Sequence, residues 1–469
     1  MSWVVCAVTR ALGAPGSENK LYATYAPQHA GLRPELPTQS RPPCRGYLEE
    51  AYGFFIMRLI HTSDWHLGHD LHGFDRGVEH AAFLDWLARR LVELRADALI
   101  ITGDVYDAVN PPIPAQQRLY RFLSRVLGEC PHLQIVIIGG NHDSAARLEL
   151  PKDLLDPARV HVFGGMPRHQ GRPAPVSALV QLHDETGAPR AMCAAIPYLR
   201  PGDLPAIATG ESAIKAIYRE AIEAANAVRG NLPLIVTGHL HMSGGAVSEL
   251  SERRIVLGGE EAVSSDIFPS SVAYVALGHL HKPQSISGQT TIRYAGSPFP
   301  MSVTEKDYKH SIVVLDLDDA GRMKTELLPT PRPVAFYRVP SLGAAPLEAV
   351  EAELRRLEIE DPGEDRRPFL EVAVQLSSAE PELKRRIDAA LEGKPVRLTR
   401  IVRQTAGEGG TLADAVEESA TLSELEPAHV FASRHSEAYG TAPPDDLRRA
   451  FDEVLAGVLS GNDEPGGAV

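Results

Sequence analysis

The sequence predicts a multidomain protein whose largest part is a layered α/β domain. Its 469 residues exceed one typical domain, and about 150 residues per domain would give three. The composition, 43% hydrophobic and 23% charged, is that of ordinary globular chains, so wholesale disorder, collagen and coiled-coil classes are excluded. Short apolar runs alternate with helical patterns between residues 57 and 330, which is typical of strands alternating with helices.

The first 56 residues differ from the rest because they are rich in proline, glycine and small residues and show no sustained period. We interpret residues 1–56 as a disordered arm; a start codon placed too early, with Met57 as the first residue, is equally plausible. No run of about 18 apolar residues follows, so we expect no contact with a membrane and a cytoplasmic location.

The α/β domain is predicted over residues 57–330. The apolar residues of two helices recur at helical spacing, at 79–95 and 115–127. Either helix face could pack within the chain or form a homodimer, and amphipathicity does not separate the two. The predicted strands are Met57–His61, Ala98–Ile101, Ile135–Ile138, Leu234–Thr237 and Val272–Leu277.

A second pattern begins after residue 330 and predicts a small α+β domain over 331–405. Its expected elements alternate as strand, helix, strand, helix and strand, at Phe336–Val339, 347–357, Phe369–Leu376, 381–391 and Val396–Arg403. A glycine-rich break then leads to a segment, 411–460, with two predicted helices at 422–435 and 445–459. The second helix has a one-sided apolar stripe.

The net charge of −14 at first argues against a nucleic-acid partner, because phosphate contacts require lysine and arginine. The charge is unevenly distributed. Residues 411–469 contain 12 acidic residues and three arginines, and this segment therefore accounts for −9 of the net charge of −14. The remaining chain is only mildly acidic. The acidic helical tail suits docking onto a partner helix, and packing back onto its own domain is the alternative.

Polar side chains follow each of the five predicted strands. Taken singly, a Gly-Asp pair or a lone histidine is more often structural than functional. Because ligands of open α/β sheets bind beyond the carboxyl ends of strands, all five sets are expected at one edge. These candidate ligands are Asp64, His66, Asp104, Asn141, His239, His279 and His281.

Seven oxygen and nitrogen donors without a thiolate suit two divalent cations of the Mn²⁺ type. A carboxylate shared by both ions would hold the pair together, and we assign this bridge to Asp104. The pair would clamp a phosphate and make hydroxide from water near neutral pH. His142 is predicted to act on the reacting phosphate or leaving oxygen. Asp143 would orient the ring of His142 or stabilise a turn.

The order D-x-H, G-D, G-N-H-D, G-H, G-H-x-H resembles that of the calcineurin-like metallophosphoesterases. The longer strings GDVYDAVNPP, YAGSPFPMS and TLSEL are similar to those of the SbcD family of bacterial nuclease subunits, and the likeness spans residues 57–459. This resemblance implies a metallophosphoesterase β-sandwich flanked by helices, followed by a DNA-capping domain and C-terminal helices. It also implies a DNA exonuclease and endonuclease that acts in repair, recombination and replication.

Carried over by position, the resemblance implies two ligand sets that share Asp104, with His142 catalytic. One set is Asp64, His66, Asp104 and His281, and the other is Asp104, Asn141, His239 and His279. The chain departs from archaeal and eukaryotic relatives three residues after the bridge, where they often carry a histidine and this chain has Asp107. The resemblance therefore does not carry an exonuclease-specific role over to Asp107.

The same resemblance implies an ATPase partner, SbcC, in a heterotetramer with two copies of each subunit. With it, the activities would be an ATP-dependent 3′-to-5′ exonuclease on duplex ends and an endonuclease on single strands and hairpins. In the capping domain, residues 384–403 carry a net charge of +5. A DNA-binding role is predicted there for Arg397, Arg400 and Arg403, and a solvated face explains the charge equally well.

Three classes of function therefore compete. A DNA nuclease subunit is favoured, and the alternative is a phosphatase or cyclic-nucleotide phosphodiesterase on the same two-metal core. A catalytically inactive scaffold is disfavoured because the ligand set is complete. About 130 residues beyond the core argue against a minimal small-molecule phosphoesterase, although the shape of the site decides the substrate.

Overall fold

Two six-stranded sheets form the centre of the main domain. The structure, a computed structural model, describes residues 55–205, 212–248, 262–318, 320–378, 380–405, 431–432, 434–435, 441 and 443–460. The first sheet has the order β16 (Met323–Pro329), β15 (Ser311–Asp318), β1 (Phe55–Thr62), β4 (Ala98–Thr102), β5 (Gln134–Ile138), β6 (Val160–Phe163). The second has the order β13 (Gln284–Ile286), β14 (Thr291–Tyr294), β12 (Tyr274–Gly278), β11 (Leu234–His239), β10 (Pro189–Ala194), β9 (Leu179–His183).

The two sheets pack face to face through alternate residues of their strands. Ile100 of β4 and Val136 of β5 lie in one buried cluster with Ile235 and Ala276 of the second sheet. Their strand neighbours, such as Leu99, belong to another cluster on the outer face. Since side chains alternate across a strand, continuous apolar runs can serve both faces of a buried sheet.

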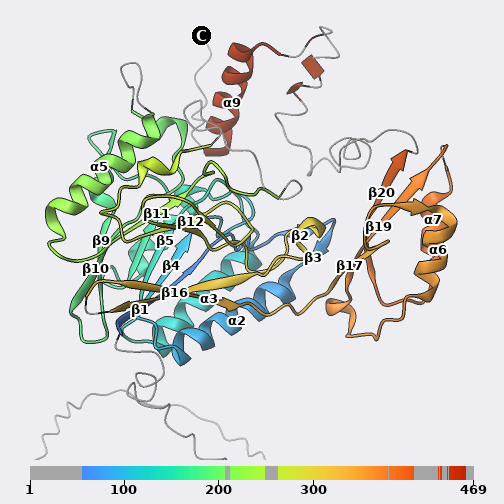
Figure 1. Cartoon of the computed structure of the whole chain (residues 1–469), viewed down its shortest axis with the longest axis horizontal. Coiled ribbons are helices and arrows are strands. Elements are labelled where there is room, and N and C mark those ends of the chain that lie inside the picture. Colours follow the sequence, from blue (N-terminus) through green and yellow to red (C-terminus); the bar gives the residue numbers. More distant parts are fainter. Residues whose placement is uncertain are drawn as a thin grey trace, which may run out of the picture. The chain divides into compact units, whose positions relative to one another are not determined.

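Helices cover the outer faces of this sandwich. Helices α2 (Gly77–Glu93) and α3 (Ile113–Glu129) pack on the first sheet. Helix α5 (Ala213–Val228) packs on the second sheet, and Figure 1 shows it on the opposite side from α2 and α3. The predicted layered α/β class, with a β-sandwich between helices, is confirmed.

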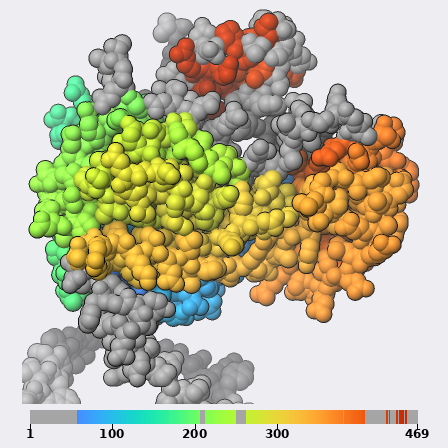
Figure 2. Space-filling view, viewed as in Figure 1, coloured from blue at the N-terminus to red at the C-terminus, as the bar shows by residue number. Residues whose placement is uncertain are grey.

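The small α+β domain has its own sheet and its own core. Strand β19 (Phe369–Leu376) pairs in parallel with β17 (Phe336–Val339), β18 (Ala345–Pro346) and β20 (Arg397–Thr405). Helices α6 (Leu347–Arg356) and α7 (Leu383–Ala390) cover one face of this sheet. In Figure 2 these residues form the orange lobe.

The remaining elements are short or lie near the C-terminus. Helix α9 (Asp445–Ser460) matches one of the two predicted terminal helices. The other, at 422–435, and the arm at 1–56 lie largely outside the described residues. A hairpin, β2 (Asp70–Leu71) and β3 (Phe74–Asp75), follows β1, and β7 (Arg168–His169) pairs with β8 (Arg172–Pro173). In the described part of the chain, no helix has the length and apolar character needed to span a membrane.

Candidate metal centre

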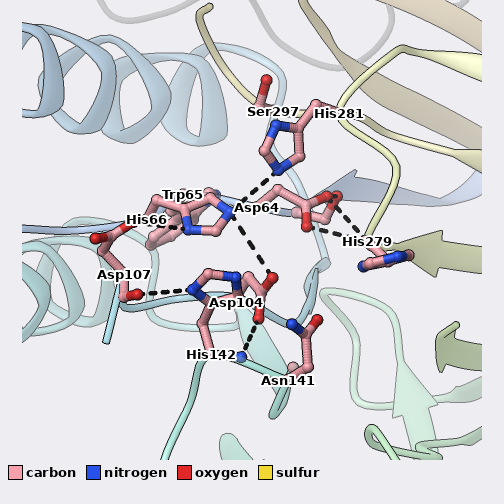
Figure 3. A network of polar contacts seen from close by, with 12 residues as sticks. Asp64, Trp65, His66, Asp104, Asp107, Asn141, His142, His279, His281 and Ser297 are labelled. Carbon is pink, nitrogen blue, oxygen red and sulfur yellow. Dashed lines mark hydrogen bonds and ion pairs between the residues drawn. The ribbon is translucent and has the colours of Figure 1, made fainter. Parts of the chain in front are cut away.

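The structure brings the seven predicted ligands together where strands of both sheets end. In the first sheet, β1, β4 and β5 run parallel, so the loops after them leave from the same edge. In the second sheet, β11 and β12 are also parallel, and His239 is the last residue of β11. The centre therefore spans the edges of both sheets rather than one. Figure 3 shows most of these side chains pointing toward a common point.

Short distances connect the ligand atoms. Nε2 of His66 lies 3.2 Å from Nε2 of His281 and 3.7 Å from Oδ2 of Asp104. Nε2 of His239 lies 3.3 Å from the same Oδ2 and 2.9 Å from Oδ1 of Asn141. Two ring nitrogens at hydrogen-bond distance cannot both present lone pairs unless a proton or a cation lies between them. This arrangement fits a divalent metal centre.

Three overlapping groups of side chains could each hold an ion. The carboxylate of Asp104 belongs to two of them, which makes it the shared ligand of the cluster. All the side chains in these groups are buried. Their donor atoms are nitrogen and oxygen, which divalent ions of the Mn²⁺ type prefer to sulfur. The groups are Asp64–His66–His281, His66–Asp104–His142 and Asp104–His239–His279.

Burial and mutual charge perturb these side chains strongly. Burial raises the pKa of Asp64. Burial also works against ionisation of Asp104, but the nearby positive charges of His239 and His142 hold its pKa well below the usual range. The pKa of His239 is raised to about 9, because Asp104 outweighs the effect of burial. A divalent ion supplies the same positive charge, so it competes with the proton for His239.

Four of the predicted ligands have backbone in the left-handed region, which non-glycine residues rarely adopt. Their φ angles are 53° at Asp64, 44° at His66, 46° at Asp104 and 99° at His279. Each such residue costs on the order of 1–3 kcal/mol and persists only where the surroundings enforce it. Strain concentrated on the ligands indicates a functional site.

Trp65 supplies part of that enforcement. It lies between two ligands in the sequence and is fully buried against the rings of Phe83 and Phe122, with centroid distances of 5.7 and 5.4 Å. Its indole Nε1 donates to Oγ1 of Thr62 across 3.0 Å. The packing of this side chain into the α2–α3 core therefore anchors the loop that carries Asp64 and His66.

Two glycines allow the loops to approach each other closely. A Cβ at Gly140 would clash with the carboxylate of Asp104, and a Cβ at Gly278 would clash with the carbonyl oxygen of Thr102. Any side chain at these positions would displace the shared ligand or separate the two sheets.

A second layer of groups fixes the orientation of the ligand rings. Nδ1 of His281 donates to Oε1 of Glu305 across 2.8 Å, and both residues are buried. Nδ1 of His239 donates to the carbonyl of Thr102 across 2.9 Å. Nδ1 of His66 lies 3.2 Å from Oδ1 of Asp107. Each contact directs the other ring nitrogen, Nε2, toward the ligand cluster.

Sequence reasoning missed Glu305 and left the role of Asp107 open. Glu305 ends the short 3₁₀-helix η5 (Val303–Glu305), 24 residues beyond His281, and no sequence pattern there predicts a contact with that histidine. Its other oxygen accepts from the backbone N–H of Met301 across 2.8 Å, which positions the carboxylate. The contact of Asp107 with His66 could not be predicted either, because it depends on how the β4 loop turns.

His142 lies beside the ligands. Nδ1 of its ring donates to the carbonyl of Asp107 across 2.7 Å. Since a carbonyl can only accept, Nδ1 carries a proton, and Nε2 remains as the ring nitrogen that can act beside His66 and Asp104. The backbone N–H of His142 also donates to Oδ1 of Asp104 across 2.9 Å. A general acid or base could act from this place.

Asp143 holds backbone. Its carboxylate accepts N–H groups from Val105 at 3.1 Å, Tyr106 at 2.9 Å and Gly140 at 2.9 Å. These bonds tie the loop after β5 to the loop after β4 and favour the turn role over the expected orientation of the His142 ring. The group that orients this ring is the carbonyl of Asp107, which no sequence pattern could indicate.

The three arginines predicted to bind DNA do not share one face. The register pairs Arg397 with Phe369 and Arg400 with Glu371, on one face, and Arg403 with Val374, on the face covered by helices. An irregularity between Leu370 and Glu371 shifts the alternation. A strand periodicity read from sequence alone cannot include such a bulge.

Arg397 is already engaged. Its guanidinium lies 3.9 Å from the centroid of the Phe369 ring, and its Nε donates to the carbonyl of Arg367 across 2.8 Å. Phe369 packs with Leu71 and Phe336 in a small buried cluster, and the Arg76 guanidinium lies 5.5 Å from the centroid of the same ring. A packing role for Arg397 is therefore evident from the structure.

Two of the five excess positive charges counted over residues 384–403 are paired with acids outside that segment, since Asp388 is already included in the count. Lys384 pairs with Asp388 at 2.6 Å, Arg385 pairs with Glu382, and Arg386 pairs with Glu351 at 2.7 Å. Two of these acids, Glu382 and Glu351, lie outside the counted segment. The local charge is therefore less positive than the count over the segment, because folding places Glu351 of α6 beside α7.

Two family models match parts of the sequence. Residues 57–283 match the family of calcineurin-like phosphoesterases, and residues 332–439 match the type 5 capsule protein repressor C-terminal domain, SbcD_C. A dimetal phosphatase structure from Danio rerio aligns over 59% of this chain and 100% of its own, at 13% identity and a TM-score of 0.34.

Two relatives cover most of the chain. The SbcD subunit of the SbcCD nuclease of Rhodobacter capsulatus is 40% identical over 408 residues, which span 85% of this chain and 93% of the relative. The SbcD subunit of the Escherichia coli nuclease is 31% identical over 395 residues, 81% of this chain and 92% of the relative. The chain therefore belongs to the SbcD family of SbcCD nuclease subunits and carries their calcineurin-like phosphoesterase domain.

Proposed function

We propose that the chain is a metal-dependent DNA nuclease subunit that hydrolyses phosphodiester bonds at two divalent ions. The observation that carries the proposal is that Asp104, which is buried, belongs to two of the three ligand groups. One ion would be held by Asp64, His66, Asp104 and His281, and the other by Asp104, Asn141, His239 and His279. The nitrogen and oxygen donors suit Mn²⁺.

The bound ions would polarise the phosphodiester and supply hydroxide from water near neutral pH. His142 would act at the leaving oxygen or the reacting phosphate through Nε2, because its Nδ1 is fixed on the carbonyl of Asp107. Asp104 would belong to both ligand sets and so hold them together. Its Oδ1 also accepts the backbone N–H of His142, which fixes the loop that carries this residue. Glu305 would keep Nε2 of His281 directed at its ion.

The domains would divide the work. Residues 57–330 would be the nuclease domain, residues 331–405 the DNA-capping domain, and residues 411–460 the helices that dock on the partner. Exposed apolar side chains on α9, at Leu447 and Val454, support docking. The partner would be the SbcC ATPase, because the relatives are named as subunits of SbcCD nucleases.

With that partner, the proposed activities are an ATP-dependent 3′-to-5′ exonuclease on duplex ends and an endonuclease on single strands and hairpins. The assembly would contain two copies of each subunit, act in DNA repair, recombination and replication, and be cytoplasmic.

Digestion of end-labelled duplex and hairpin DNA with Mn²⁺, with and without SbcC and ATP, tests the proposal. We expect cleavage of both substrates, stimulation of duplex digestion by SbcC with ATP, and loss of cleavage on His142→Gln. A small diester, bis(p-nitrophenyl) phosphate, serves as the control for the phosphodiesterase alternative. Hydrolysis of this diester with no cleavage of any DNA would reject the nuclease in favour of that alternative.

A further inference from the structure

Two side chains outside the ligand set, Tyr198 and Arg200, extend from the metal centre. Both follow β10, in the sequence IPYLRPGD. The ring of Tyr198 stands perpendicular to the ring of His239, with centroids 6.4 Å apart. The guanidinium of Arg200 then lies 5.7 Å from the centroid of the Tyr198 ring. The imidazole of His239, the phenol of Tyr198 and the guanidinium of Arg200 thus lie in a row in space.

Backbone groups of the catalytic loops hold both residues in place. Nη2 of Arg200 donates to the carbonyl of Asp143 across 2.8 Å, and Nη1 donates to the carbonyl of Gly164 across 3.4 Å. The backbone N–H of Tyr198 donates to the carbonyl of Gly139 across 2.9 Å. Arg200 is therefore preorganised beside the loop that carries Asn141 and His142, rather than free in solvent.

The positive charge of Arg200 has no carboxylate partner within the part of the chain that the structure describes. Its acceptors are carbonyl oxygens, and the nearby acid, Asp203, pairs with Arg168 at 2.8 Å. The hydroxyl of Tyr198 likewise has no hydrogen-bond partner among the described residues, and this side chain is half-buried. A guanidinium fixed by neutral acceptors keeps its charge and its remaining donors available to an anion.

We propose that Arg200, with Tyr198, binds the DNA backbone phosphate next to the scissile one, on the side of His239. This inference rests on the proposed nuclease function. The guanidinium takes the phosphate through its remaining donors, the ring of Tyr198 supports the guanidinium, and the Tyr198 hydroxyl adds one donor. A small diester has no second phosphate, so this contact distinguishes a nucleic-acid strand from a small substrate.

The test measures binding of a labelled single-stranded oligonucleotide to the full chain in the His142→Gln background with Mn²⁺, at several salt concentrations. Arg200→Gln should weaken binding about tenfold or more, the range of a charge-assisted hydrogen bond, and flatten the log-log salt dependence by about 0.7. Arg200→Lys should keep most of the salt dependence and lose part of the affinity. Tyr198→Phe should lose about two- to tenfold.

Arg89→Gln is the matched control, because it removes one positive charge from an exposed position on α2. It should change the affinity and salt dependence far less than Arg200→Gln. In the otherwise wild-type chain, KM for DNA should rise much more on Arg200→Gln than KM for bis(p-nitrophenyl) phosphate, with metal content and melting temperature retained.

Two results would overturn the inference. The first is an equal loss of affinity and salt dependence in Arg200→Gln and Arg89→Gln, which would leave only the general field of the protein. The second is a loss of metal content in Arg200→Gln together with a loss of activity on both DNA and bis(p-nitrophenyl) phosphate. Arg200 would then only hold the neighbouring loops in place. Failure of the nuclease function itself is distinct, because the wild-type chain would then neither bind nor cut DNA.

Discussion

Glu305 holds His281 through a hydrogen bond of 2.8 Å between two buried side chains, on the side of the ring that faces away from the ligand cluster. The same carboxylate accepts the backbone N–H of Met301, so the loop after β14 and the ligand loop after β12 are locked together. A ligand whose orientation is fixed in this way binds its ion without first losing rotational freedom.

Glu305→Gln should therefore lower metal affinity by about ten- to a hundredfold, the range for such supporting residues. The amide keeps the volume but removes the charge that stabilises the imidazole, and its NH₂ opposes the Met301 N–H or the ring. Titration with Mn²⁺ under equilibrium dialysis measures the affinity. Glu326→Gln, at an exposed position on β16, is the control. Equal affinities of the two variants would contradict the role of Glu305.

Asp104→Asn and His142→Gln should both abolish nuclease activity, by different routes. Loss of the shared carboxylate should reduce the number of bound ions, whereas loss of the His142 ring should leave both ligand sets able to bind. Metal analysis of the purified variants after dialysis distinguishes them. Unchanged metal content in Asp104→Asn would reject the bridging assignment.

We expect replacement of Arg397 to change stability and replacement of the other two arginines of β20, Arg400 and Arg403, to change DNA binding. Arg397→Gln should lower the free energy of unfolding of the small domain by about 0.5–2 kcal/mol, since it removes the cation from the Phe369 ring. Thermal unfolding measures this change. If the DNA-binding role belongs to the other two, joint replacement of Arg400 and Arg403 should flatten the salt dependence of duplex binding by up to about 0.9 per contact.

The control for that double variant is an equal change of charge on exposed positions of the main domain, at Arg89 and Arg121. If both double variants lose the same affinity and the same salt dependence, the capping domain has no phosphate contact at Arg400 or Arg403, and the predicted DNA-binding role ends there.

His80 should make the protein less stable in acid. Burial, aided by Arg76, lowers its pKa to about 3, while in the unfolded chain it titrates near 6.5. Between these two pKa values the unfolded state binds a proton at His80 and the folded state does not. The contribution of neutral His80 to the free energy of unfolding is therefore complete above pH 6.5 and is lost as the pH falls toward 3. The slope should reach about 1.4 kcal/mol per pH unit.

Urea unfolding between about pH 7 and pH 5 measures that slope. In His80→Gln the slope should be smaller than in the wild type by up to about 1.4 kcal/mol per pH unit, with the largest difference near pH 5. His169→Gln, at an exposed position, should leave the slope nearly unchanged. Parallel curves for the wild type and His80→Gln would show that this histidine does not contribute to acid sensitivity.

The sequence predicts the strands that end at the metal centre well, because each is a short, continuous apolar run. Ala98–Ile101, for example, is found within β4, one residue shorter than the strand itself. Strands β9 and β10 were not predicted, although β9 alternates between buried and more exposed residues and the turn after it carries the signal Asp184-Glu-Thr-Gly187. The division into two sheets follows from strand pairing, which local periodicity does not contain.

The clustering of the candidate ligands could be predicted for a similar reason. A side chain directly after a parallel strand has its position set by the strand, as for Asp104 after β4. The positions of Glu305, Asp107 and Arg200 could not be predicted, because these residues lie in segments between strands whose paths depend on tertiary packing. Peptide carbonyls such as that of Thr102 are present at every residue, so no residue type marks the one that orients His239.

Thermal stability and activity make opposite demands on the four positions with left-handed backbone, Asp64, His66, Asp104 and His279. Glycine would adopt each of these φ angles without strain, so a substitution there relieves the backbone while it removes a ligand. Laboratory evolution under selection for heat resistance alone should therefore accept changes at these positions early. The same selection with DNA cleavage required should never recover them, and the added stability would have to come from the cores behind the sheets.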